Sequence, residues 1–348
     1  MVRVWLDRLV RQLRPSLPWL AGDFVRVLTA LGIAMAGTSL PTRPAVASPT
    51  QIWMGGSTAF ERDHMFHDRS SDYLDLFDPN APWQGVAQHV RALRIDSSLL
   101  SHTPDGTLRK VFADLKRRNI ALAMEAPMLS VRDNCGVDLE GYHVPNFIRD
   151  TGARIRNLGG DLRFLAMDSA LWFGHHYQGP RACKLTVPEL ANDVAGKVRE
   201  LRSIFPQIKI GDIDPVSGPN LPADWTEQIM GWAHAYQAAV GESWSFFIAD
   251  VQWSAPWRDN MSTIAARLRA EGIQFGVIYD ASGQEANAAD WARDVEQHYQ
   301  AVEAGLGLSP DIALFHSWVR WPDRMLPAVQ SGTMTNIIDR YVAWKSRK

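Results

Sequence analysis

The chain has 348 residues, of which 46% are hydrophobic and 21% are charged, and its formal net charge is −2. This composition is that of an ordinary globular protein, and the length allows one large domain with a full core. The slightly negative charge argues against nucleic acid as a partner, because a polyanion needs a basic surface.

The first 47 residues have a composition of their own. Arginines come first, and the apolar run FVRVLTALGIAMAGTSL follows. Ala45-Val46-Ala47 then forms a small-x-small pattern, so we expect a bacterial export signal over residues 1–47 that is cut after Ala47. The apolar run contains Arg26 and is shorter than the roughly 20 apolar residues of a membrane span, so a retained anchor is the less favoured alternative. Because residues 1–47 contain six Arg and two Asp, cleavage would leave a net charge of −6.

Residues 48–348 alternate between short apolar strands and amphipathic helices. The expected strands are nearly continuous apolar runs, as is typical of strands that are buried on both faces. They lie at 50–56, 92–98, 120–126, 162–168, 208–214, 245–250, 273–280 and 311–318. A helix is expected to start at Trp83, and longer helices are expected at 107–119, 144–160, 187–206, 223–241, 256–272, 286–305 and 333–345.

This alternation predicts one (β/α)8 barrel domain over residues 48–348. Gly, Asn or Pro stops each helix shortly before the next strand, as at Asn119, Gly241 and Gly272. Long loops are expected after the first, third, fourth and eighth strands. In this fold, the working face is the one at the carboxyl ends of the strands.

Almost every expected strand ends in an acidic residue. Cleavage of a glycosidic bond needs two carboxyl groups, one as proton donor and the other as nucleophile or base. We expect Asp168 and Asp250 to fill these roles, with Asp280 and Glu125 as reserves. Any one of these acids has an alternative role in capping a helix or pairing with an arginine. A whole ring of acids is harder to explain in that way, because close carboxylates repel one another.

Further polar and aromatic residues at the same strand ends fit a sugar-binding site. Indole rings stack on the apolar faces of sugars, and carboxylates and imidazoles bind the hydroxyl groups. For each aromatic residue, ordinary packing is the alternative. The expected substrate-binding residues are Asp96, Trp172, His175, Asp212, Asp214, Trp253, Tyr279, His316 and Trp318.

The sequence contains neither a HExxH motif nor a cysteine pair with zinc-site spacing, so neither a metal nor a cofactor is expected. Asp212 and Asp214 must share one face of their strand, and they leave a divalent-ion site as a minor alternative. Cys135 and Cys183 are the only cysteines. They follow neighbouring strands, so we expect a disulfide between two loops of the working face; two free thiols are the alternative.

The layout as a whole resembles the broad group of glycoside-hydrolase (β/α)8 barrels, without identifying one family. In the barrels of the α-galactosidase and α-glucosidase type, aspartates that end the fourth and sixth strands act as nucleophile and acid/base. Asp168 in FLAMDSA and Asp250 in FIADVQW match these places.

The resemblance implies a glycoside hydrolase with a carbohydrate substrate, and the expected export signal implies that it is periplasmic or secreted. A carbohydrate-binding barrel without activity, such as a component of an exopolysaccharide system, and a metal-dependent hydrolase or lyase are the alternatives. The sequence gives no indication of the oligomeric state.

Overall fold

The computed structural model describes residues 49–56, 72–318 and 320–348. The expected export signal at 1–47 lies outside the described residues, as does most of the loop after the first strand. The boundary between signal and barrel domain therefore stays a prediction.

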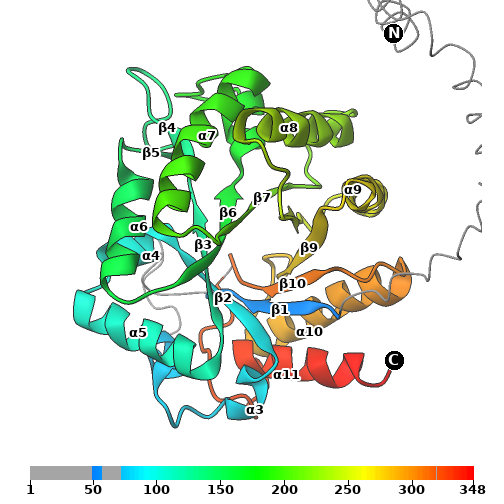
Figure 1. Cartoon of the computed structure of the whole chain (residues 1–348). Helices are drawn as coiled ribbons and strands as arrows, with labels where there is room; N and C mark the ends of the chain where they lie inside the picture. The colour runs from blue at the N-terminus through cyan, green and yellow to red at the C-terminus, as the bar shows by residue number, and fades with distance from the viewer. Residues whose placement is uncertain (1–48, 57–71, 319) are drawn as a thin grey trace, which may run out of the picture. The chain divides into compact units, whose positions relative to one another are not determined.

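Within the described residues, eight parallel strands close into a barrel, and helices surround it (Figure 1). The predicted (β/α)8 fold is thus confirmed. Going around the barrel, β10 lies between β1 and β9, and β2 lies on the other side of β1. In chain order the strands are β1 (Gln51–Met54), β2 (Val90–Asp96), β3 (Ala121–Ala126), β6 (Leu162–Asp168), β7 (Lys209–Pro215), β8 (Phe246–Asp250), β9 (Gln274–Tyr279) and β10 (Ile312–Phe315).

The long helices agree with the predicted ones and differ mainly at their ends. Asn119, in the left-handed conformation, ends α5, and the α7 helix starts with a capping box of Thr186 and Glu189. The helices are α5 (Asp105–Arg118), α6 (Phe147–Asn157), α7 (Val187–Ile204), α8 (Trp225–Val240), α9 (Arg258–Ala270), α10 (Ala288–Gln300), which continues into η4 (Ala301–Gly305), and α11 (Met334–Lys345).

Short elements account for the differences from the sequence-based prediction. The helix expected from Trp83 is only the four-residue α3 (Gln84–Ala87), because Val90 already pairs with Ile52 as the start of β2. Two strands that were not predicted, β4 (Leu129–Ser130) and β5 (Tyr142–His143), pair in the loop after β3. The other unpredicted elements are η2 (Tyr73–Phe77), α4 (Ser97–His102) and η3 (Trp172–His176). No helix in the described ranges has the length and apolar character that a membrane crossing requires.

Apolar side chains fill the interior of the barrel below the carboxyl ends of its strands. The rings of Trp53 and Phe164 lie 4.7 Å apart, and Phe246 packs 5.2 Å from Trp53. Small residues such as Ala92 and Ala123 complete this inner cluster. Because side chains alternate between the two faces of a strand, the residues two or four places after these ones also point inward, at the carboxyl ends of the strands.

Candidate active site

The alternation in the strands brings four of the predicted acids to the same end of the barrel interior. Asp96 follows Ala92 on the inner face of β2, and Glu125 follows Ala123 on β3. In the same way, Asp168 follows Phe164 and Ala166 on β6. Asp250 follows Phe246 and Ile248 on β8. The inner apolar cluster therefore lies directly below a ring of carboxyl groups and forms the floor of the site.

One buried arginine lies inside this ring. The Arg94 side chain is 1% exposed, and its Nε donates a hydrogen bond of 2.7 Å to Oε2 of Glu125. Burial raises the pKa of Glu125, and Arg94 opposes this effect. The Nη1 atom of Arg94 also lies 3.4 Å from both ring nitrogens of His316, which is fully buried. His316 needs Gly55 beside it, because a Cβ on Gly55 would lie 2.5 Å from its Nδ1.

The structure adds one acid that the sequence-based analysis missed. Glu140, in the loop between β4 and β5, forms a hydrogen bond with the carboxyl group of Asp168. The residue as a whole is exposed, but its carboxyl group is crowded among the acids of the ring. Loss of water and repulsion by Asp250 and Glu125 raise the pKa of Glu140 to about 7. The pKa of Asp168 is also raised, by burial first and then by Glu140 and Glu125.

A hydrogen bond between two carboxyl groups requires a proton on one of them. Glu140 and Asp168 therefore hold one proton between them over a range of pH, and the pair titrates as a unit. A signal for Glu140 was present in the sequence, since a bridge from Cys135 to Cys183 draws its loop toward the end of the strand 162–168. The pattern of acids at strand ends does not include Glu140, because Glu140 does not end a barrel strand.

Asp250 and Asp280 differ in how their carboxyl groups are held. Burial raises the pKa of Asp250 to about 6, while Arg94 and the backbone N–H of Val251 lower it. Asp280 is 3% exposed and accepts hydrogen bonds from the backbone N–H of Trp318 and Ala281, both at 2.7 Å, and from Nε1 of Trp291 at 3.3 Å. Its pKa is raised to about 7, mainly by burial. The carboxylate of Asp280 thus fastens the segment around Trp318 to the barrel.

A cavity of about 500 Å³ opens beside the ring. The carboxyl-bearing residues Glu140 and Asp250 line it, together with the indoles of Trp172 and Trp318. Gln252 and Asn220 add amide groups to the wall. Trp318 is 39% exposed, and its ring lies 4.1 Å from that of His316 and 5.1 Å from the Arg94 guanidinium. The cavity therefore combines carboxyl groups, hydrogen-bonding amides and accessible indole surface.

Asp212 and Asp214 do not belong to this ring, which corrects the prediction for them. They share one face of β7, as predicted, but this face is opposite to Ile213, which belongs to the inner cluster. Asp212 accepts a hydrogen bond of 3.1 Å from Nε1 of Trp232 in α8, and Asp214 accepts from the backbone N–H of Trp172 at 3.0 Å. Both side chains are fully buried between the barrel and the helices. A shift of one residue in the register decides this placement.

Three other predicted substrate-binding residues are also placed in packed positions. Trp253 is 8% exposed, and its ring stacks on His298 at 4.0 Å. Tyr279 points outward and donates a hydrogen bond of 2.9 Å to Glu303. The Nδ1 atom of His175 lies 2.6 Å from the carbonyl oxygen of Leu185 and fixes the loop after β6. Trp253 and Tyr279 pack in the large hydrophobic cluster, and neither lines the cavity.

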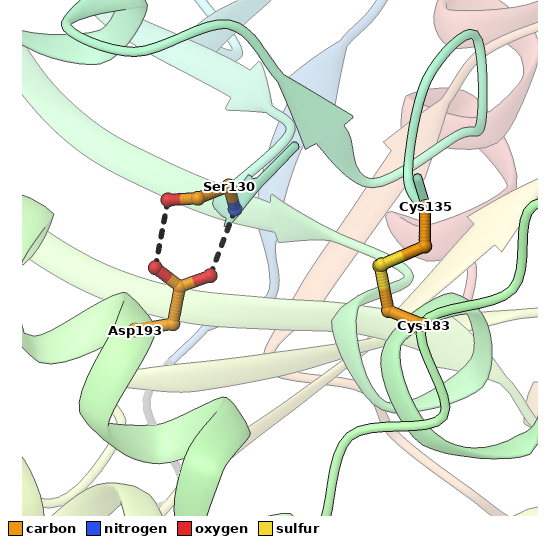
Figure 2. Close-up of a disulfide and its surroundings, with 4 residues drawn as sticks. All are labelled: Ser130, Cys135, Cys183 and Asp193. Atoms are coloured by element: carbon orange, nitrogen blue, oxygen red, sulfur yellow. Dashed lines mark hydrogen bonds between the residues drawn. A yellow bond between two sulfur atoms is a disulfide. The ribbon is translucent and has the colours of Figure 1, made fainter. Parts of the chain in front are cut away.

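The predicted disulfide is present. Cys135 and Cys183 are bonded, and they join the loop after β3 to the loop after β6 (Figure 2). Among the described residues, no group of three or more His, Cys, Asp or Glu side chains is arranged to hold a metal ion.

The chain matches no protein-family model and no curated protein sequence. Some solved structures resemble it, at low identity and with TM-scores under 0.5. A fungal β-1,4-galactanase is 11% identical, with a TM-score of 0.46 over 73% of this chain and 88% of the galactanase. A Thermomonospora fusca β-mannanase in complex with mannotriose is also 11% identical, with a TM-score of 0.47 over 79% of this chain and 80% of its own.

A D-psicose 3-epimerase, solved in the presence of D-fructose, is 9% identical, with a TM-score of 0.44 over 83% of this chain and 89% of the epimerase. Likenesses at these identities and scores assign no activity to this chain.

Proposed function

We propose that this protein is a glycoside hydrolase that cleaves glycosidic bonds in an oligosaccharide or polysaccharide. The observation that supports this proposal most strongly is the placement of Glu140 and Asp250 on one cavity, with Asp168 hydrogen-bonded to Glu140. Two separate carboxyl sites beside one cavity are what acid and base or nucleophile chemistry on a glycosidic bond requires.

In this proposal, Asp250 is the general acid. A carboxyl group whose pKa is raised to about 6 keeps a useful protonated fraction in weakly acidic solution, and it can donate its proton to the leaving oxygen. Asp168 acts from the other side of the bond, as nucleophile or as the base that activates water. The pair of Glu140 and Asp168 shares one proton and carries a single negative charge, and Asp168 takes this role when it is the ionised member of the pair.

The indoles give the cavity its proposed preference for sugars. Trp172 and Trp318 line the same space as the carboxyl groups, and Trp318 has accessible surface. An indole face and an adjacent hydrogen-bonding amide suit the alternating apolar and hydroxyl surfaces of a sugar ring. Asp96 and Glu125 of the inner ring are proposed to bind hydroxyl groups at the floor of the site.

We also propose that the protein acts outside the cytoplasm. A disulfide is typical of exported proteins, and Cys135 and Cys183 form one here. The expected export signal at residues 1–47 supports the same location.

The test is a screen of residues 48–348 against bacterial and plant polysaccharides, with released reducing ends as the readout. Release from one glycan that is lost in Asp168→Asn would support the proposal and identify the substrate class. Tight binding to a glycan without release would favour a binding protein instead. Activity that disappears with a chelator and returns with a divalent ion would favour a metal-dependent enzyme.

A further inference from the structure

Glu140 lies in a loop whose two ends are held together by a pair of short strands. This Glu140 loop, residues 127–146, leaves β3 and returns to α6. Its two short strands pair in parallel, with Leu129 N–H donating to the Gly141 carbonyl at 2.9 Å and Val131 N–H donating to the His143 carbonyl at 3.1 Å. The pairing holds the two ends of the loop together, and Glu140 comes just before the returning strand.

The first anchor of the loop is Asp193 in α7 (Figure 2). Its carboxylate accepts hydrogen bonds from the backbone N–H and from the hydroxyl of Ser130, both at 2.8 Å. Lys197, one turn further along α7, donates to the same carboxylate at 2.7 Å. Burial alone would raise the pKa of Asp193, but Lys197 and Ser130 more than offset this effect and lower it. Asp193 is therefore a charged, fixed acceptor for the loop.

The second anchor lies between the two short strands of the loop, where the disulfide joins Cys135 to Cys183 (Figure 2). Hydrogen bonds reinforce the junction. The backbone N–H of Gly136 donates to the Arg181 carbonyl at 2.8 Å, and the Arg181 guanidinium donates to the carbonyl of Val137 at 3.1 Å and to Asp138 at 2.6 Å. Cys183 and Arg181 belong to the loop that follows Asp168, so this anchor ties together the two loops that contribute the carboxyl pair.

The Glu140 loop also approaches the end of β6, at Gly141. A Cβ on Gly141 would lie 3.1 Å from the backbone carbonyl oxygen of Asp168, which is closer than most side chains tolerate. Gly141 also has a φ of +80°, in the left-handed region that favours glycine. The backbone next to Glu140 thus comes so close to the backbone of Asp168 that it leaves little room for a side chain at position 141.

We propose that Cys135, Cys183 and Arg181 are positioning residues, which hold the Glu140 carboxyl group against Asp168. When this anchor is removed, Glu140 moves into solvent and the carboxyl pair separates. The effect on catalysis rests on the proposed function, whereas the placement of Glu140 is measurable without any substrate.

The test follows the titration of Glu140 in the full chain with carbon-13 at the glutamate side-chain carboxyls. Glu140→Gln identifies the Glu140 signal. In the oxidised protein we expect this signal to titrate near the value of about 7 given by its crowded setting. In Cys135→Ser/Cys183→Ser it should move toward the ordinary glutamate value of about 4.3. An unchanged titration in the double variant would overturn the proposal.

Reduction of the native protein provides the same test without a substitution. Since the chain contains two cysteines, a dithiol such as dithiothreitol can reduce only this one bond. Two electrons and two protons pass to the sulfurs of Cys135 and Cys183, and the dithiol becomes a cyclic disulfide. The Glu140 signal should shift as in the double variant, and reoxidation should restore it.

Arg202→Ala is the matched control, because it removes an exposed ion pair with Glu242 far along α7 and should leave the Glu140 signal in place. Circular dichroism checks that each sample is folded. If the double variant does not fold, Arg181→Ala replaces it, with a shift in the same direction expected and an unchanged signal counting against the proposal.

Once a substrate is known, kcat of the double variant should fall about tenfold or more, and adding Glu140→Gln to it should cause little further loss. If the wild-type protein turns over no glycan, the proposed function fails, while the titration still decides whether the anchor positions Glu140.

Discussion

Arg94 and Glu125 form an ion pair inside the barrel, with Nε and Oε2 2.7 Å apart and both side chains nearly without exposure. The pair links β2 to β3 directly above the inner apolar cluster, at the floor of the candidate site. Arg94 also lies beside His316 and the indole of Trp318. It is a buried cation among the carboxyl groups at the strand ends.

Replacing Arg94 with Met should destabilise the protein by about 3–5 kcal/mol, because it leaves Glu125 as an uncompensated buried charge or forces its protonation. Denaturant unfolding at neutral pH measures this loss. The double variant Arg94→Met/Glu125→Leu should recover most of the stability. A single variant as stable as the double one would show that the pair contributes nothing.

Asp168→Asn and Asp250→Asn should each lower kcat by about 10²–10⁴-fold, the usual contribution of a positioned acid or base. The two variants should differ with an aryl glycoside whose leaving group is dinitrophenolate. This leaving group departs without a proton, so Asp250→Asn should keep much of its activity on it and Asp168→Asn should not. Asp161→Asn, on the opposite face of the barrel, is the control. Full activity of either site variant on a natural glycan would remove that residue from the mechanism.

The stability of the protein should decrease as the pH rises from about 4 to about 7. The pKa of Asp250 is raised to about 6 and that of Asp280 to about 7, so the folded state binds more protons than the unfolded chain over this interval. Their stabilising contribution is complete below the unfolded pKa of about 4 and is lost as the pH passes the folded pKa.

Thermal unfolding of the wild type and of Asp250→Asn across this pH range tests the Asp250 part. His143, His176 and His298, whose pKa values are lowered by burial, act in the opposite direction in both proteins, so the comparison cancels their effect. The melting temperature of Asp250→Asn should fall less between pH 4 and pH 7 than that of the wild type. Parallel curves would contradict the shift at Asp250.

Trp318→Ala should raise KM about tenfold with a smaller change in kcat, which corresponds to about 1.4 kcal/mol of lost stacking on the sugar. Trp253→Phe is the matched control. Because Trp253 packs against His298 away from the cavity, its replacement should lower the melting temperature and leave KM unchanged. The reverse pattern would show that the sugar platforms have been assigned to the wrong indoles.

The sequence alone determined the order of the elements and the fold. Each barrel strand is a short apolar run, each helix has its polar face and its stop signal, and these local patterns depend on burial and backbone geometry rather than on distant partners. The acids Asp96, Glu125, Asp168 and Asp250 could be placed on the working face, because they end barrel strands. Each side chain at such a place can point in only two directions, into the barrel or out toward the helices.

The tertiary structure decided which of these two directions each residue takes. Asp212 and Asp214 end a strand in the same way as Asp168, yet a one-residue difference in register turns both away from the barrel interior. Asp212 accepts a hydrogen bond from Trp232 instead, and Asp214 accepts one from the backbone of Trp172. Glu140 shows the opposite case, since it ends no barrel strand and meets Asp168 from a loop that folds back and is joined to Cys183. Local sequence patterns record whether a residue is buried, whereas the partner it meets depends on how strands and loops come together in space.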